Sequence, residues 1–394
     1  MTLRRAWMPM VAGVVAASLV GCATVPDEPE QESYFYFPEP PHPPRIQFLT
    51  SVPHTGVWSS GSERNSSFAE WVAGETPDSK PSTRIETPYG VGAYQGRVYI
   101  CDVDRSTIHW MDVKTGAYGQ MNTPEDLKIP LNITIDDRDG TKYVCDTAHR
   151  MIFVFDAEDN FVRRLGDPSL LAEPTDLAIH GDELYILDRQ DGEIEVWSRQ
   201  GERLRTIAQK GAGPDDLEMP QNLAIGPDER IYVTDSGGRA KRVKIFDLDG
   251  RYQGSIGQPG NRVGSFAIPK GIAIDPDGHI YVSDSYYGVV QIFNTDGQPL
   301  LVISGRPEGA PGVVLPAALA IDRTSLSAFQ DYIDPDFDAE YLLFLINQRS
   351  GPRKLSIYAY GRSRSRPVED YEIQVTDEDE SEEEVRKDKD EPAD

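Results

Sequence analysis

The sequence predicts an all-β chain folded as a six-bladed β-propeller, and two observations carry this prediction. Short runs of β-branched and aromatic residues alternate with turns of Gly, Asp and Pro, a pattern typical of antiparallel meanders. A unit of four such runs recurs, and its copies begin at Pro88, Pro130, Pro174, Pro220, Pro269 and Pro316. A period of about 40 to 50 residues with four strands per unit indicates propeller blades rather than a helical solenoid.

The copy that begins at Pro269 shows the four strands most clearly. A first strand, 272–274, is followed by the turn 275–278, and a second strand, 280–283, ends at Asp284. A third strand, 289–293, and a fourth, 300–304, complete the unit. The second-strand signature, a tyrosine three residues before an aspartate, recurs as Tyr99 to Asp102, Tyr143 to Asp146, Tyr185 to Asp188, Tyr232 to Asp235 and Tyr281 to Asp284.

Closure of the ring requires a fourth strand for the sixth blade, and the sequence offers two candidates. One is Arg45 to Val52, which is similar to the outer strand Tyr252 to Ile256, and the other is Tyr371 to Val375. We favour the N-terminal strand, because its pairing with the last blade would remove an exposed sheet edge. The predicted propeller therefore spans residues 46–375.

The N-terminus has the pattern of a lipoprotein signal. Arg4 and Arg5 precede an apolar run, 8–20, that is too short to span a bilayer. Leu19 to Cys22 (LVGC) resembles the lipobox of bacterial lipoproteins, and an ordinary secretory signal is the alternative. The resemblance implies removal of residues 1–21, acylation of Cys22 (a palmitate-type modification) and anchoring in the cell envelope, with the outer membrane favoured because Ala23 rather than an aspartate follows.

Residues 22–45 are rich in proline and acidic residues and read as an extended tether. Its aromatic cluster, Tyr34 to Phe37, either stays in the tether or docks on the domain, since four aromatic side chains are unfavourable in water. A short helix is predicted over Phe68 to Ala73, with Ser67 and Glu70 at the spacing of a capping box.

The repeats resemble the NHL repeat. The string Ile272 to Gly278 (IAIDPDG), followed by Tyr281 to Asp284 and by Val289 to Phe293, carries this resemblance, and repeats one and six depart from it most. It covers about residues 88–360 and implies a six-bladed propeller. Together with the lipobox and the tether, it resembles a narrower group of bacterial NHL lipoproteins, which has no settled biochemical role.

The charge of the chain argues against nucleic acid as a partner. The formal net charge is −26, and the last nineteen residues, 376–394, hold eleven acidic and three basic residues. Phosphate contacts reward positive charge, so this net charge argues against nonspecific nucleic-acid binding by the whole protein. The segment 376–394 is predicted to be a disordered acidic tail.

Two cysteines follow Cys22, and both lie at the same position of the repeat. Cys101 and Cys145 each precede the aspartate that ends the second strand. Equivalent positions point the same way around a ring, so we expect two buried free thiols, with a disulfide as the alternative.

The sixth repeat contains an acidic insertion, 323–340, between its first two strands. Its acids alternate as in a calcium loop, but Pro335 interrupts it and no glycine supplies the sharp bend. A solvated acidic loop is therefore the preferred interpretation. The acids are Asp331, Asp334, Asp336, Asp338 and Glu340.

The second residue after each blade proline should lie near the mouth of the central channel. In three consecutive blades this residue is Asn132, Asp176 and Asn222, and the other blades carry Gly90, Gly271 and Ala318. The three polar side chains form an arc suited to a hard cation or a polar ligand, as in lactonase-like propellers with a channel metal. Turn capping is the preferred interpretation, so no cofactor is predicted, with Ca²⁺ or Zn²⁺ in the channel as the alternative. None of the six histidines occupies the arc, which argues against zinc lyase chemistry.

The loops after the second strands are basic for so acidic a protein. For Arg105, Arg150 and Arg189 we expect ion pairs with the aspartates that end the second strands. The run 237–242 exceeds what one ion pair requires, so a partner-binding surface is equally well supported there. The candidate binding residues are therefore Asn132, Asp176, Asn222, Arg239, Lys241, Arg242 and Lys270.

These features favour a membrane-anchored module of the cell envelope that binds or scaffolds another envelope protein through its loops. The alternative is a hydrolase or lyase that acts in the channel, possibly with a metal, and the arc of Asn132, Asp176 and Asn222 is its single candidate site. No nucleophile elbow or phosphate-binding glycine loop is present in the sequence, which favours the binding module.

Overall fold

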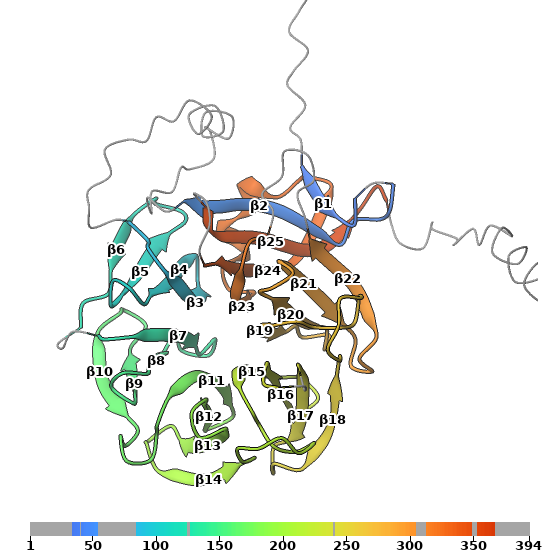
Figure 1. The fold of residues 1–394 in the computed structure, drawn as a ribbon. Coiled ribbons are helices and arrows are strands. Elements are labelled where there is room, and N and C mark those ends of the chain that lie inside the picture. The colour runs from blue at the N-terminus through green and yellow to red at the C-terminus, as the bar shows by residue number, and fades with distance from the viewer. Residues whose placement is uncertain are drawn as a thin grey trace, which may run out of the picture. The chain divides into compact units, whose positions relative to one another are not determined.

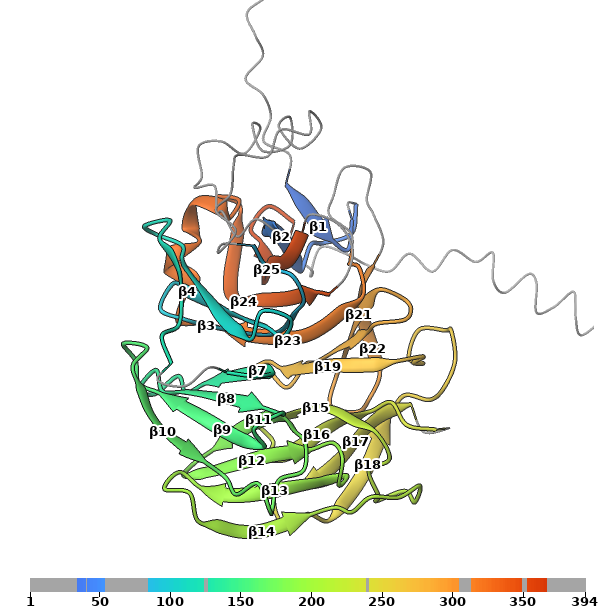
Figure 2. The ribbon, with the colours of Figure 1, turned by 60° about the vertical axis from the view of Figure 1, so that its left-hand side comes forward.

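The computed structural model describes residues 34–39, 41–53, 84–123, 127–238, 241–304, 313–348 and 353–366. Its strands form six antiparallel sheets around a central axis, so the predicted six-bladed β-propeller is confirmed (Figure 1). When the molecule is turned by 60°, the strands from β7 to β14, which belong to blades two and three, are seen one below another (Figure 2). No helix among the described residues is long and apolar enough to cross a membrane.

The first five blades each consist of four strands in chain order from the channel outward. Blade one contains β3 (Pro88–Tyr94), β4 (Arg97–Asp102), β5 (Thr107–Asp112) and β6 (Tyr118–Gln120). Blade two contains β7 (Pro130–Ile135), β8 (Lys142–Asp146), β9 (Met151–Phe155) and β10 (Phe161–Leu165). Blade three contains β11 (Pro174–His180), β12 (Glu183–Asp188), β13 (Glu193–Ser198) and β14 (Arg203–Ile207). Blade four contains β15 (Pro220–Ile225), β16 (Arg230–Asp235), β17 (Arg242–Asp247) and β18 (Tyr252–Ile256). Blade five contains β19 (Pro269–Ile274), β20 (Ile280–Asp284), β21 (Val289–Phe293) and β22 (Pro299–Ser304).

Blade six combines strands from both ends of the chain. Its inner strands are β23 (Pro316–Asp322), β24 (Phe337–Asn347) and β25 (Arg353–Ser363). β2 (Ile46–Pro53) pairs with β25 as the fourth strand, which confirms the N-terminal strand as the one that closes the ring. β1 (Phe35–Phe37) adds a fifth strand by pairing with β2, so the aromatic cluster docks on the blade.

Two sides of the propeller differ in their connections. We call the side that carries the loops between the second and third strands and between successive blades the loop face. The opposite side carries the turns between the first and second and between the third and fourth strands, and we call it the turn face. Six hydrophobic clusters form the core, one between each pair of neighbouring blades.

The second-strand tyrosines show why an aromatic residue with a polar tip recurs in this position. The rings of Tyr99, Tyr185, Tyr232 and Tyr281 are buried between blades. Their hydroxyls reach polar partners, for example Asp228 at 2.7 Å from the Tyr232 hydroxyl. Each side chain thus contributes a large apolar area without leaving a buried hydroxyl unpaired.

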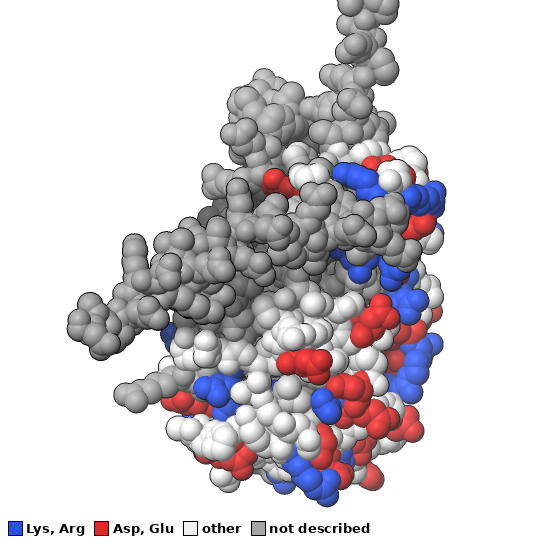
Figure 3. Space-filling view, turned by 90° about the vertical axis from the view of Figure 1, so that its right-hand side faces the viewer, with Lys and Arg blue, Asp and Glu red and all other residues white. Residues whose placement is uncertain are grey.

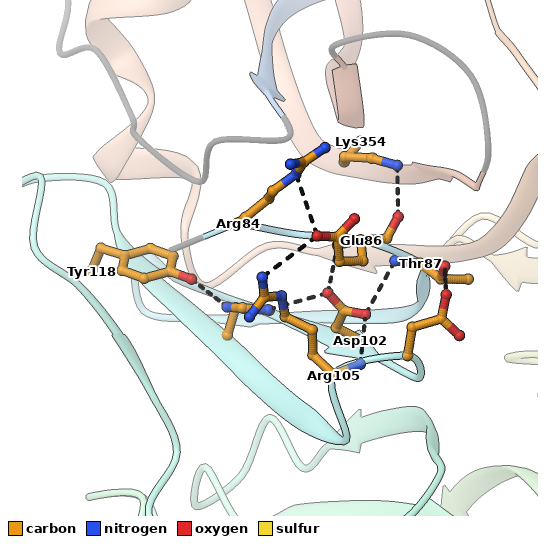
Figure 4. Close-up of polar contacts among 9 residues, drawn as sticks. Arg84, Glu86, Thr87, Asp102, Arg105, Tyr118 and Lys354 are labelled. Atoms are coloured by element: carbon orange, nitrogen blue, oxygen red, sulfur yellow. Dashed lines mark hydrogen bonds and ion pairs between the residues drawn. The ribbon is translucent and has the colours of Figure 1, made fainter. Parts of the chain in front are cut away.

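The aspartate that ends the second strand in each of blades one to five fastens two loops to its blade. The buried carboxylate of Asp188 accepts hydrogen bonds from the backbone N–H groups of Ala172 at 2.6 Å, Glu173 at 3.0 Å and Asp191 at 3.1 Å. Figure 4 shows the equivalent contacts in blade one, where Asp102 binds the N–H of Thr87 at 3.1 Å. Corresponding bonds are made by Asp146, Asp235 and Asp284.

The expected ion pairs between loop arginines and these aspartates are not formed. Arg189 instead binds Glu173, with its Nε 3.0 Å from a carboxylate oxygen, and Arg105 lies 3.5 Å from Glu86. The aspartate oxygens already accept backbone N–H groups, so the arginines pair with the acidic side chain that precedes the blade proline by one or two residues. Both arginines therefore form ion pairs within their own blades, as expected, but with Glu173 and Glu86 rather than with the aspartates that end the second strands.

The acidic insertion of blade six packs against the core, so its description as a solvated loop is wrong. Two short 3₁₀ turns, η3 (Leu326–Ala328) and η4 (Gln330–Tyr332), bury Phe329 completely and leave Tyr332 only 7% exposed. Thr324 and Ser325 accept hydrogen bonds from the backbone N–H of Gln95 and Gly96 in blade one, both at 2.8 Å. The insertion therefore links the last blade to the first.

The acids of the insertion bind separate groups rather than one ion. Asp334 is bonded by the hydroxyl of Tyr36, and Asp336 accepts a hydrogen bond from the Ser363 hydroxyl at 2.7 Å. Asp338 pairs with Arg364. These carboxylates point to different partners on β1 and near the end of β25, which does not match a calcium loop.

Cys101 and Cys145 are free thiols and are 0% and 1% exposed, as predicted. Burial raises the pKa of the Cys145 thiol, so it is a packing residue rather than a reactive group. The signal 1–21 with Cys22, most of the tether, the helix predicted over 68–73, the strand candidate 371–375 and the tail 376–394 lie outside the described residues.

The contacts of Asp188 generate a prediction about stability. Asp188→Ala should lower the free energy of unfolding by about 2–4 kcal/mol, because it leaves several buried N–H groups without an acceptor. Asp188→Asn should cost less, since its amide oxygen can still accept a bond, as the side chain of Asn347 does from the Val314 N–H at 3.0 Å in blade six. Chemical denaturation of both variants measures the difference, and equal losses would contradict this role of the carboxylate.

Candidate functional site

The structure brings Asn132, Asp176 and Asn222 together, as the sequence predicted, but buries them at 7%, 5% and 1% exposure. The three residues lie on the first strands of blades two, three and four. Asp176 is at the centre, where the side-chain amide of Asn132 donates to its Oδ1 at 2.7 Å and that of Asn222 to its Oδ2 at 3.0 Å. The arc is thus a hydrogen-bonded network that joins three blades.

The carboxylate of Asp176 has no oxygen left for a further ligand. Besides the two amides, its Oδ1 accepts the N–H of Leu177 and its Oδ2 accepts the N–H of Leu223, both at 2.9 Å. Four donors occupy about four lone-pair sites of a carboxylate. A cation would have to displace these donors, and the described residues contain no cluster of three or more Asp, Glu, His or Cys side chains that could hold a metal. The donor set therefore fits a structural role better than a metal centre, and that role is to join three blades rather than to cap a turn.

Burial raises the pKa of Asp176 to about 6, against the hydrogen bonds that favour the charged form. Loss of hydration is thus only partly offset by the four donors. The amide oxygen of Asn222 accepts no hydrogen bond from any described residue, although its side chain is buried. One buried acceptor of the network, the Asn222 amide oxygen, therefore has no donor among the described residues, which is unfavourable for a buried polar group.

A cavity of about 440 Å³ occupies the channel beside this network. It is lined at one end by the arc and at the other by Asp136, Asp137 and Arg138, which lie in the first turn of blade two. Between them the first strands of all six blades contribute aliphatic walls. The cavity thus extends from the arc toward the turn face, and Tyr89 and Lys270 on the loop face are not part of its lining.

The mouth on the loop face is occupied by side chains from three blades. The ammonium group of Lys270 lies 4.8 Å from the centre of the Tyr89 ring and donates to Gln348 Oε1 at 2.7 Å. Burial and then the charge of Arg189 lower the pKa of Lys270 to about 8. Lys270 is therefore at the mouth, as predicted, but it is separate from the arc.

The basic run after β16 does not join this mouth. Arg242 donates to the Ser255 hydroxyl on the outer strand β18 at 3.4 Å, so it is directed away from the channel. Lys241 directly precedes β17 and has a φ of 23°, and Arg239 is outside the described residues. Figure 3 shows the side of the molecule that carries β18 and β22, where acidic and basic residues are interleaved.

The loop face carries a set of exposed apolar residues that were not predicted from the sequence. In four blades the residue directly before the blade proline is apolar and at least 39% exposed. Two tyrosines of the loop after β20, Tyr286 and Tyr287, are 69% and 40% exposed and contact each other edge to face at 5.1 Å. We call these six residues the apolar collar: Ile129, Met219, Ile268, Leu315, Tyr286 and Tyr287.

The collar is densest over blades five and six. Ser285, next to Tyr286, binds the carbonyl of Ile268 through its N–H at 3.0 Å, and its hydroxyl binds the carbonyl of Pro316. Ile268, the two tyrosines and Leu315 are therefore neighbours. The signal in the sequence is an apolar residue before the proline in four repeats, but a strand pattern does not show whether such a residue is exposed.

The raised pKa of Asp176 predicts a pH dependence of stability. The folded protein holds the proton of this carboxyl more tightly than the unfolded chain, so stability should fall by up to about 3 kcal/mol as pH rises from about 4 to about 6. Asp176→Asn should remove this decrease, whereas Asp182→Asn, at a side chain that is 91% exposed, should retain it. Denaturation at a series of pH values tests this, and parallel curves for all three proteins would contradict it.

Comparison with solved structures supports the fold. The chain is similar to a gluconolactonase from Xanthomonas campestris, with 18% identity, a TM-score of 0.51, and coverage of 70% of this chain and 87% of that chain. It is also similar to a protein of unknown function from Bacteroides thetaiotaomicron, with 13% identity, a TM-score of 0.55, and coverage of 80% and 75%. At such low identity these likenesses show the architecture alone.

Comparison at the level of sequence is narrower. Curated protein sequences give no significant match to the chain. The NHL repeat family matches residues 266–293, which hold most of blade five from the loop before Pro269 to the end of β21. This is the copy in which the repeat is clearest. The chain therefore carries an NHL repeat and folds as a six-bladed β-propeller.

Proposed function

We propose that this propeller is a binding or scaffolding module of the cell envelope, which contacts another protein through its loop face. The apolar collar is the observation that supports this proposal most directly. Contiguous exposed apolar residues on a soluble surface usually mark interaction sites, and tyrosine and methionine are enriched in protein interfaces. Ile268, Leu315 and the tyrosine pair provide such a patch.

The backbone that carries the collar is held rigidly. The N–H groups of Met219 and Ile268 are bound by Asp235 at 2.8 Å and by Asp284 at 3.2 Å. Fixed loops lose little conformational entropy on binding, so a partner would meet a preformed surface.

The alternative, a hydrolase or lyase in the channel, has less support. Its single candidate site is the arc, and the oxygens of Asp176 are already occupied by four N–H donors. A general base also needs access to a substrate proton, whereas Asp176 is 5% exposed and Asn222 1%. We therefore favour the binding module.

The lipobox resemblance supports a proposal for where the module acts. We infer that Cys22 is acylated and anchors the chain in the envelope, with the outer membrane favoured by Ala23. Several acyl chains anchor stably, since each buried methylene contributes about 0.8 kcal/mol.

The collar proposal predicts the effect of making the surface polar. In the variant Ile268→Ser, Tyr286→Ser, Tyr287→Ser, crosslinking in intact envelopes followed by mass spectrometry should recover at least about tenfold less partner, since interface hot spots each cost about 2 kcal/mol or more. The control is Val162→Ser, Leu300→Ser, two residues that are 54% and 52% exposed on outer strands. Equal crosslinking by both variants would refute a role for the collar.

The anchor proposal predicts that Cys22→Ser abolishes incorporation of labelled palmitate and releases the chain from the membrane fraction. Cys101→Ala is the matched control, because this buried thiol has no part in attachment, and it should remain labelled and membrane-bound. Palmitate labelling that persists in Cys22→Ser would show that another residue is acylated.

A further inference from the structure

Lys270 is a cation at the mouth of the propeller that has no carboxylate within ion-pair distance among the described residues. Its contacts are the ring of Tyr89 and the amide oxygen of Gln348. Arg189, in contrast, is paired with Glu173. The charge of Lys270 is thus shared with two neutral groups, although an ammonium can donate three hydrogen bonds.

The backbone of Lys270 is fixed by its neighbours. The Thr234 hydroxyl of blade four donates to its carbonyl at 2.6 Å. The next residue, Gly271, packs so closely on blade six that a Cβ there would lie 2.1 Å from the carbonyl oxygen of Ala317. Blades four and six lie on opposite sides of β19, so this strand is held from both sides at Lys270 and Gly271. The base of the lysine side chain therefore has little freedom.

The groups around the ammonium come from three other blades. Tyr89 of blade one is buried, which raises its pKa to about 12, so its hydroxyl is neutral. Arg189 of blade three adds positive charge, but its partner Glu173 offsets it. Gln348 of blade six is uncharged. Lys270 also follows the collar residue Ile268 by two positions, and Tyr286 and Leu315 lie next to that residue.

We propose that the loop face binds a protein segment in which a carboxylate lies beside aliphatic or aromatic residues. The carboxylate binds Lys270, and the apolar side chains pack on Ile268, Leu315 and the tyrosine pair. This inference rests on the proposed function and adds the chemistry of the partner. It follows from complementarity, because an ammonium that has no ionic partner among the described residues and follows the exposed Ile268 by two positions matches one negative charge within an apolar segment.

A dianion fits this mouth less well. A phosphate group favours several cations or a forked guanidinium, whereas Arg189 is engaged by Glu173 and that carboxylate would repel a second negative charge. The side chains of the collar also provide contacts that a compact phosphate would leave unused. We therefore assign the site to a carboxylate rather than to a lipid phosphate.

The test uses the full chain and two short peptides, acetyl-Ser-Leu-Glu-Leu-Ser-amide and its analogue with Gln in place of Glu. Methyl groups of Met219 and Ile268, labelled for NMR, report binding at the collar. The Glu peptide should bind at least about tenfold more tightly than the Gln peptide, which corresponds to one favourable charge contact. In Lys270→Met this preference should disappear, while the weak binding of the Gln peptide persists.

The pH dependence identifies the cation. Affinity for the Glu peptide should stay constant between about pH 6 and pH 8, where the peptide carboxylate and the ammonium are both charged. It should fall by up to about tenfold per pH unit above pH 8, because the free ammonium of Lys270, whose pKa is about 8, loses its proton there. Lys270→Arg should show no such fall, since a guanidinium remains charged. The groups that face Lys270 are Tyr89, whose pKa burial raises to about 12, Arg189 with Glu173, and the uncharged Gln348.

Three results would overturn the inference. One is equal binding of the two peptides, and another is a preference for Glu that survives Lys270→Met. The third is the shift of the collar methyls by vesicles of phosphatidylglycerol but not by the Glu peptide, which would assign the face to a lipid surface. Crosslinking of the collar variants measures the proposed function separately, so the loss of this inference alone would leave that result unchanged.

Discussion

The architecture depends on one repeated interaction, a buried carboxylate at the end of the second strand that accepts backbone N–H groups from two loops. A carboxylate that accepts several such bonds offsets the cost of its burial and satisfies donors that would otherwise be unpaired. In the first five blades of this propeller the bonds join the entry of the blade to the loop after its second strand. Both segments belong to the loop face, which is therefore rigid although it contains few strand residues.

The collar follows from this interaction. The N–H of the residue before the blade proline is one of the groups that the aspartate holds, as for Ile129, Met219 and Ile268. With its backbone held inward and the proline fixed in the strand, the side chain is left on the outside. The backbone of the residue before the blade proline is thus constrained, whereas its side chain is not needed for the fold. Four of the six blades carry an apolar residue at this position.

Much of the fold could be predicted from the sequence, because strand patterns, turn residues and the spacing of prolines are local signals. Closure by Arg45 to Val52 was also predictable, since an unpaired edge needs a partner. The partners of Arg105 and Arg189 were not, because spacing alone does not reveal that the nearby aspartates already accept backbone donors. The burial of Phe329 and Tyr332 was not predicted, because the acidic residues of the same insertion indicated a solvated loop.

The candidate site was predictable in part. The repeat register placed Asn132, Asp176 and Asn222 together, but their exposure depends on how closely the first strands approach one another, which the sequence does not encode locally. Lys270 was placed at the mouth by the same register. Its contact with Tyr89 joins blades five and one across the ring, and such contacts become visible only when the ring is closed.

The position of β2 has a consequence for the order in which the chain folds. Ile46 pairs with Tyr360, so the first long strand to be synthesised must wait for nearly the last one before its edge is covered. Pairing across such a separation is slow, because it closes a very large loop. Until then the cluster that contains Val52 and Ile357 is incomplete and leaves apolar surface open between the first and last blades.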